Sequence, residues 1–112
     1  AMSKARFAAA QFEGYIEDGN WLRTARHANV MARRLADGIA RSGTSRLGWE
    51  PQANEVFAVL PKAGIAALRA AGATLHEWAA ENIEVGPEED LVRLVTSFAT
   101  SGEEVERFVG ML

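Results

Sequence analysis

The chain has 112 residues, 48% of them apolar and 24% charged, and this composition predicts one globular domain with a single hydrophobic core. Its net charge of -3, with arginines interspersed among carboxylates, argues against nucleic-acid binding. The absence of cysteine excludes disulfides, thiol nucleophiles and thiolate metal sites, and two histidines are too few for a self-contained zinc site.

The N-terminal half has the periodicity of helices. Residues 3–17 carry apolar side chains at helical spacing, and Asp18-Gly19-Asn20 ends that pattern, so a first helix is expected there. Asn20 then caps a longer amphipathic helix that stops at Ser42-Gly43. The polar residues 44–52 predict a loop.

The C-terminal half alternates strands and helices. Pro61 stops the first strand, Gly72 ends the helix that follows it, and Ser101 with Glu104 has the spacing of a capping box. Between these signals, the acidic segment 81–90 predicts a solvated loop. The predicted elements are strands at 54–60, 74–78 and 91–98, and helices at 62–71 and from Ser101 to the end. This order predicts an α+β two-layer fold, in which a small, mainly antiparallel three-stranded sheet carries helices on one face.

Arg93 interrupts the apolar strand in LVRLVTSFAT. A guanidinium stays charged and offers five donors, so on such a strand it needs either solvent or a bound anion. Two explanations stay open from the residues alone: an edge strand that faces water, or a receptor for a carboxylate or phosphate.

The two histidines are interpreted as structural. His27 lies at the edge of a helical stripe. His76 shares a strand face with Trp78 while Glu77 points to the other face, which does not make an acid–base pair.

The first predicted helix carries an aromatic stripe, and two interpretations have equal weight: a core face, or a face that docks on another part of the protein. The stripe consists of Phe7, Phe12 and Tyr15. No apolar run approaches the length of a membrane span and the N-terminus lacks the apolar core of a signal peptide, so a cytoplasmic protein without membrane contact is expected.

Four sequence blocks together resemble the C-terminal portion of a low-specificity L-threonine aldolase, a β-eliminating-lyase-like member of the fold-type I pyridoxal phosphate enzymes. The blocks, in order, are QFEGYIEDGNWLRTARHANVMARRLADGI, ANEVFAVLP, IAALRAAGATLHEW and LVRLVTSFATSGEEVERFV. The resemblance implies that residues 1–19 are a connecting helix and that residues 20–112 are the small C-terminal α+β domain of such an enzyme.

The resemblance also implies that the cofactor-binding residues of such enzymes are absent from this chain. In such aldolases a large N-terminal domain supplies the lysine that binds pyridoxal 5'-phosphate, the histidine beside its ring and most phosphate contacts, and the complete enzyme cleaves threonine or allo-threonine to glycine and acetaldehyde. Lys4 and Lys62 match no such lysine motif. The chain alone is therefore expected to be inactive and free of cofactor, and to belong to a homo-oligomeric enzyme together with the large domain.

Three residues match positions of the family. Arg93, in an R-L-V-T block, matches the small-domain arginine that binds the substrate carboxylate. Arg6 is a weaker match to an arginine near the cofactor phosphate, because the glycines of that motif are missing here. Asn54 matches an asparagine before the first small-domain strand, where a turn or capping role is equally expected. The alternatives are a free-standing binding or assembly module derived from this domain, and a purely structural fragment that forms oligomers.

Overall fold

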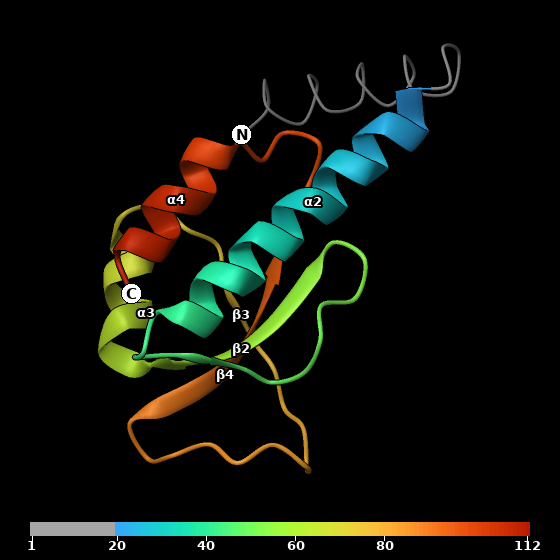
Figure 1. The fold of residues 1–112 in the computed structure, drawn as a ribbon. Coiled ribbons are helices and arrows are strands. Elements are labelled where there is room, and N and C mark those ends of the chain that lie inside the picture. Colours follow the sequence, from blue (N-terminus) through green and yellow to red (C-terminus); the bar gives the residue numbers. More distant parts are fainter. Residues whose placement is uncertain (1–19) are drawn as a thin grey trace.

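A computed structural model of the chain describes residues 20–112, so the helix predicted at 3–17, its aromatic stripe and Arg6 lie outside the described residues. Figure 1 shows the three described helices on the same side of one sheet. The elements in order are α2 (Asn20–Arg41), β1 (Arg46–Leu47), β2 (Glu55–Pro61), α3 (Lys62–Ala70), β3 (His76–Glu77), β4 (Glu89–Val95) and α4 (Gly102–Gly110). The predicted α+β class, with helices on one face of an antiparallel sheet, is confirmed.

The sheet has four strands in the order β1-β2-β4-β3, and every neighbouring pair is antiparallel. Its centre is the pair of β2 and β4, which stay in register from Glu55 opposite Val95 to Pro61 opposite Glu89. Both strands are rich in valine and leucine, which suit a pleated, buried surface. The prediction of three strands is wrong by one, because β1 lies within the polar segment that was expected to be a loop.

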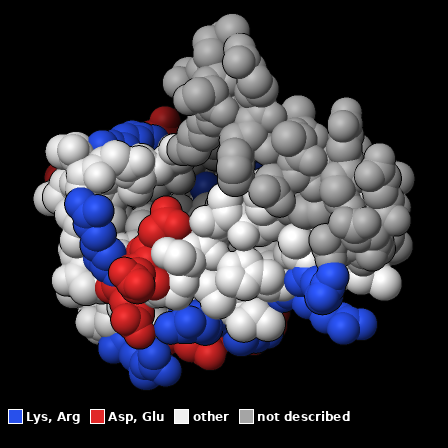
Figure 2. All heavy atoms as spheres, turned by 90° about the horizontal axis from the view of Figure 1, so that it is seen from above, with Lys and Arg blue, Asp and Glu red and all other residues white. Residues whose placement is uncertain are grey.

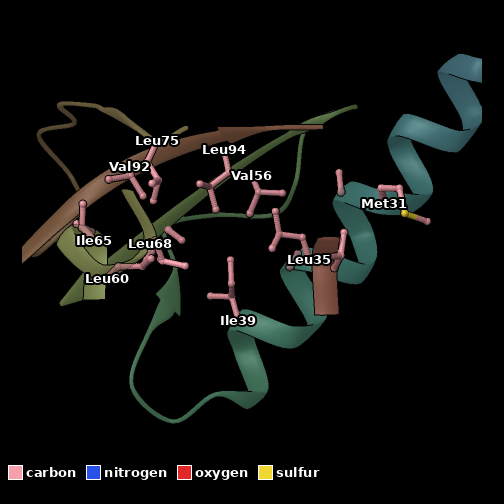
Figure 3. Close-up of a cluster of buried hydrophobic side chains, with 14 residues drawn as sticks. Met31, Leu35, Ile39, Val56, Leu60, Ile65, Leu68, Leu75, Val92 and Leu94 are labelled. Carbon is pink, nitrogen blue, oxygen red and sulfur yellow. The ribbon is translucent and has the colours of Figure 1, made fainter. Parts of the chain in front are cut away.

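The main core lies between the helices and the sheet (Figure 3). Alternate residues of the two inner strands point to this side, and side chains of all three helices meet them. Labelled members of the cluster are Met31, Leu35 and Ile39 of α2, Val56 and Leu60 of β2, Ile65 and Leu68 of α3, Leu75, and Val92 and Leu94 of β4. Each large aliphatic side chain buried here contributes about 1.5–3 kcal/mol relative to an exposed one.

The ends of the helices follow the predicted signals. Gly43, just after α2, and Gly72, just after α3, both have positive φ angles, of 77° and 99°. After α3 the amide of Ala73 donates to the carbonyl of Leu68 at 3.0 Å, the hydrogen bond of a Schellman motif. Pro61 is the last residue of β2 and also the N-cap residue of α3, so one proline ends the strand and begins the helix.

α4 begins with the predicted capping box. The amide of Glu104 donates to Oγ of Ser101 at 3.1 Å, and the amide of Ser101 donates to Oε1 of Glu104 at 3.0 Å. Further along, α4 packs closely on α2: a Cβ added at Gly38 would lie 2.4 Å from Cγ2 of Val109. The glycine in α2 therefore permits the close approach of the two helices.

Candidate functional site

The face of the sheet opposite the helices is here called the open face. It carries a second, smaller apolar cluster. Its buried members are Phe57, Val59 and Leu91, and the partly buried members packed against them are Trp49, Ala80 and Ile83. None of these residues belongs to a described helix, and strands and loops alone form this surface. The open face also carries Arg93, because residues of β4 alternate between the two faces.

Arg93 lies in the middle of β4, opposite Phe57 of β2 on one side and His76 of β3 on the other. β4 is thus an inner strand, and the edge-strand explanation of this arginine does not hold. The side chain keeps 29% of its surface exposed, so the guanidinium is neither fully buried nor freely solvated. A charge in this position needs local partners.

The guanidinium of Arg93 has few partners among the described residues. Its Nη1 donates to Oε2 of Glu55 at 3.4 Å, which is the long limit of a hydrogen bond. Its Cζ lies 5.0 Å from the centroid of the Trp78 ring, within the range of a cation–π contact. Its Nε is buried and has no acceptor among the residues that the structure describes. The side chain therefore retains hydrogen-bonding capacity that suits an anion.

A row of aromatic rings supports the arginine. Trp49 stacks on Phe57 with centroids 4.4 Å apart and ring planes inclined by 25°. Phe57 in turn meets Trp78 edge to face, with centroids 5.4 Å apart. Aromatic pairs of this kind contribute about 0.5–1.5 kcal/mol beyond their buried area. Through Trp78, the guanidinium thus contacts one end of a packed row.

Hydrogen bonds after β4 hold the strand that carries Arg93. The hydroxyl of Thr96, which is 3% exposed, donates to the carbonyl of Ala28 in α2 at 2.6 Å. Asn54 donates through Nδ2 to the carbonyl of Thr96 at 2.8 Å, and its own carbonyl accepts from the Thr96 amide at 2.9 Å. Asn54 thus closes the ladder between the two inner strands through long-range hydrogen bonds, which is neither the turn nor the capping role that the sequence predicts. Thr96 was missed, although a threonine on the apolar face of a strand is a signal that it needs an internal acceptor.

The histidines have different surroundings. His27 of α2 is half-buried, and its Nε2 makes a 2.5 Å hydrogen bond with the carbonyl of Thr100, just before α4, which fits its structural interpretation. His76 is exposed on β3, opposite Arg93 in the register. Trp78, two residues later, contacts Arg93, in agreement with the predicted shared face.

A second charged pair lies on the sheet, between β1 and β4. Arg46 makes two hydrogen bonds to the carboxylate of Glu89, at 2.9 and 3.1 Å, and a third to the carbonyl of Glu84 at 2.6 Å. The hydrogen bond from Arg46, and then that from the amide of Gly86, lower the pKa of Glu89 below its usual range, while the carboxylate raises the pKa of Arg46. The prediction of a solvated loop at 81–90 is therefore wrong for its last two residues, Glu89 and Asp90, which belong to β4, and Glu89 is ion-paired.

The described residues contain no other arrangement with the chemistry of a site. On the face drawn in Figure 2, basic and acidic side chains lie next to one another. Within residues 20–112, no group of three potential metal ligands occurs and no helix has the length and apolar character to span a membrane. A hollow of about 430 Å³ between α3, α4 and the segment after β4 is lined by both apolar and polar residues and does not include Arg93.

Comparison with known proteins connects this fold to one kind of enzyme. No protein-family profile matches the chain. Over 70 residues, or 62% of its length, it is 46% identical to the low-specificity L-threonine aldolase of Pseudomonas aeruginosa and 40% identical to that of a Pseudomonas species. The structure also superposes on the threonine aldolase of Leishmania major with a TM-score of 0.71, over 89% of the chain and at 30% identity. The chain is thus similar in sequence and in fold to part of the threonine aldolases.

The relationship covers only part of each threonine aldolase. The chain spans 20% of the two Pseudomonas enzymes and 28% of the Leishmania major enzyme. The similarity expected from the four sequence blocks is confirmed, and it extends from sequence to fold. The aldolases are much longer, so the match concerns one unit of a larger protein.

Proposed function

We propose that this chain is the C-terminal small domain of a pyridoxal phosphate-dependent threonine aldolase, and that Arg93 binds the α-carboxylate of the amino-acid substrate. The observation that supports this most is the state of the guanidinium. It is charged, lies on an inner strand, makes a single long ion pair, and has a buried Nε without an acceptor among the described residues.

Carboxylate binding suits the chemistry of the guanidinium. A carboxylate accepts two parallel hydrogen bonds from an arginine fork, and this fixes its orientation as well as its position. In cleavage of a β-hydroxy amino acid the bond between Cα and Cβ must be held in one orientation, and an arginine on a paired strand can hold the carboxylate end of the substrate in this way. A lysine offers only a point charge and no fork.

The described residues do not fit the cofactor itself. Lys62 is the only lysine among them, and it is exposed at the start of α3, on neither the open face nor the lining of the 430 Å³ hollow. When bound, pyridoxal phosphate acts as an electron sink for carbanion chemistry. In this proposal a large N-terminal domain binds the cofactor and this chain contributes Arg93, so the chain alone is inactive.

Steady-state kinetics of the complete enzyme test the role of Arg93. Arg93→Lys should lower kcat/KM for threonine by about 10- to 100-fold, because a charged hydrogen bond worth about 1.5–3 kcal/mol is lost. Arg46→Lys, a matched change at another arginine of the sheet, should leave kcat/KM within about twofold. Equal kinetics of the Arg93 variant and the wild type would remove Arg93 from the site.

A second candidate function is a free-standing module that binds a carboxylate effector through the same arginine. It draws on the observation that residues 20–112 form a packed two-layer core by themselves. Calorimetry with glycine and threonine separates the two functions. A domain that supplies one arginine to a larger site should bind these amino acids too weakly for calorimetry, with dissociation constants of about a millimolar or more that only a titration at high ligand concentration detects, whereas a receptor in its own right should bind them at micromolar concentration.

A further inference from the structure

We propose that Glu55 is an internal competitor at the arginine: its carboxylate occupies the guanidinium of Arg93 until a ligand carboxylate displaces it, and Trp78 holds the guanidinium in both states. This inference rests on the proposed carboxylate site. It adds a positioning residue, Trp78, and a residue that sets the affinity of the site, Glu55.

The register of the sheet brings the two charged side chains together. Glu55 is opposite Val95, so it is a diagonal neighbour of Arg93 on the same face of two paired strands. Diagonal neighbours have Cα atoms about 7–8 Å apart, a gap that two long side chains can bridge. The contact thus forms, and is released, by rotation of side chains alone, without any change in the backbone.

The contact is weak for an ion pair of this type. Glu55 reaches Arg93 through a single 3.4 Å contact, and the two side chains are 37% and 29% exposed. The pair of Arg46 and Glu89 on the same sheet makes two contacts, of 2.9 and 3.1 Å. An exposed ion pair contributes little to stability, and a bidentate pair is stronger than a single bond. A carboxylate that approaches the fork of Arg93 can therefore replace Glu55.

Trp78 contacts the same guanidinium independently of Glu55. Its ring centroid lies 5.0 Å from Cζ of Arg93, and Phe57 packs against the ring from the other strand. The ring restricts the arginine whether the carboxylate beside it belongs to Glu55 or to a ligand. Loss of this ring should weaken carboxylate binding, whereas loss of the Glu55 charge should strengthen it. The opposite signs of these effects distinguish the two roles.

An acetate titration of the 112-residue chain tests the proposal. The probe is sodium acetate in a buffer without other carboxylates, at constant ionic strength, and the readout is the NMR signal of the Arg93 Nε–H group. Glu55→Gln should bind acetate about two- to fivefold more tightly than the wild type, since the competing carboxylate is removed. Trp78→Leu should bind it more weakly, and Trp78→Phe should restore part of the loss.

Two further variants separate the contact from general charge effects. Glu77→Gln removes a carboxylate from the neighbouring strand β3 at a residue that points to the other face, and it should leave the acetate affinity unchanged. Glu55→Asp keeps the charge but withdraws it by one carbon, so its affinity should lie between those of the wild type and Glu55→Gln.

The outcomes distinguish this inference from the proposed function. Equal acetate affinity of the wild type and Glu55→Gln, with the Arg93 signal moving in both, overturns the competition and leaves the carboxylate site in place. Equal tightening by Glu77→Gln also overturns it, because the effect would then be one of net charge. An Arg93 signal that acetate moves in none of the variants overturns both the competition and the carboxylate site.

Discussion

The two faces of the sheet are built from the same strands and differ in what they do. The face under the helices is closed and aliphatic, with Val56, Leu60 and Val92 completely buried. The open face has fewer buried residues, two partly exposed ion pairs and a row of aromatic rings. Alternate residues of one strand point to opposite faces. The same two inner strands therefore supply the buried core on one side and the charged side chains on the other.

The sharpest test of this division compares two valines of β4. Val92 is completely buried under the helices, whereas Val95 is 49% exposed on the other face. Val92→Ala should lower the free energy of unfolding by about 2–3 kcal/mol, from two lost carbons at about 0.8 kcal/mol each and the cavity that remains. Val95→Ala should change it by less than about 0.5 kcal/mol. Urea unfolding followed by circular dichroism measures both, and equal losses would contradict the division.

A smaller effect is expected in the helix layer itself. Gly38→Ala places a Cβ 2.4 Å from Cγ2 of Val109, so α2 and α4 must move apart, at a cost of about 1–2 kcal/mol. The control is Gly64→Ala in α3, where the nearest atom, Cδ of Pro61, is at 3.9 Å. This change should stabilise the protein by about 0.5–1 kcal/mol. If Gly38→Ala stabilised the protein as much as Gly64→Ala in thermal unfolding, the close packing of α2 on α4 would not matter for stability.

The capping box at the start of α4 stabilises the helix by local hydrogen bonds, and not by packing against another layer. Ser101→Ala removes the acceptor of the Glu104 amide and should cost about 1 kcal/mol in the free energy of unfolding. Glu104→Gln keeps both hydrogen bonds of the capping box and should stay near the wild type. Chemical denaturation of the three proteins decides this, and an unchanged free energy of unfolding in Ser101→Ala would mean that packing of α4 on the core, and not its cap, holds the helix.

The smallest effect is expected for the ion pair of β1 and β4. The pKa of Glu89 is lowered in the folded state, so its pairing with Arg46 stabilises the fold above the usual glutamate pKa of about 4.3 and loses this effect as the pH falls through the lowered pKa. Arg46→Met should therefore melt at a lower temperature than the wild type at neutral pH, and the difference should shrink as the pH falls below the usual glutamate range and Glu89 is protonated.

Arg33→Met is the control for that experiment. The ion pair of Arg33 with Glu50 spans 3.4 Å, and its two side chains are 55% and 81% exposed. Its removal should change the melting temperature less, at neutral pH, than removal of Arg46. A pH-independent difference for Arg46→Met would show that packing of its stem, and not the charge pair, stabilises the edge of the sheet.

The helices of this fold could be predicted because their signals are local. The apolar period of α2, the glycine after α3 and the capping box of α4 all lie within a few residues of the structure that they determine. The strand β1 could not be predicted in this way. Its two residues, Arg46 and Leu47, are held by pairing with Val59 and Ala58 of β2, and nothing in the polar segment around them has strand periodicity.

Of the candidate site, the sequence predicts Arg93 but not the residues around it, because only the arginine has a local signal. Arg93 stood out because a charge in an apolar strand is visible in the sequence itself. Its neighbours were not visible: Glu55 is 38 positions away and reaches it only through the register of β2 and β4. Trp78 directly follows β3, a two-residue strand whose formation again depends on its partner strand. Long-range pairing, and not residue type, decides which groups surround the guanidinium.

The inner position of β4 restricts the backbone that carries Arg93. The strand is bonded to β2 and β3 on either side, and beyond its end Thr96 is tied to α2. The backbone of Arg93 therefore cannot shift alone. The position of the guanidinium is thus set by the torsions of its own side chain and by a backbone that is fixed to two strands and, through Thr96, to α2.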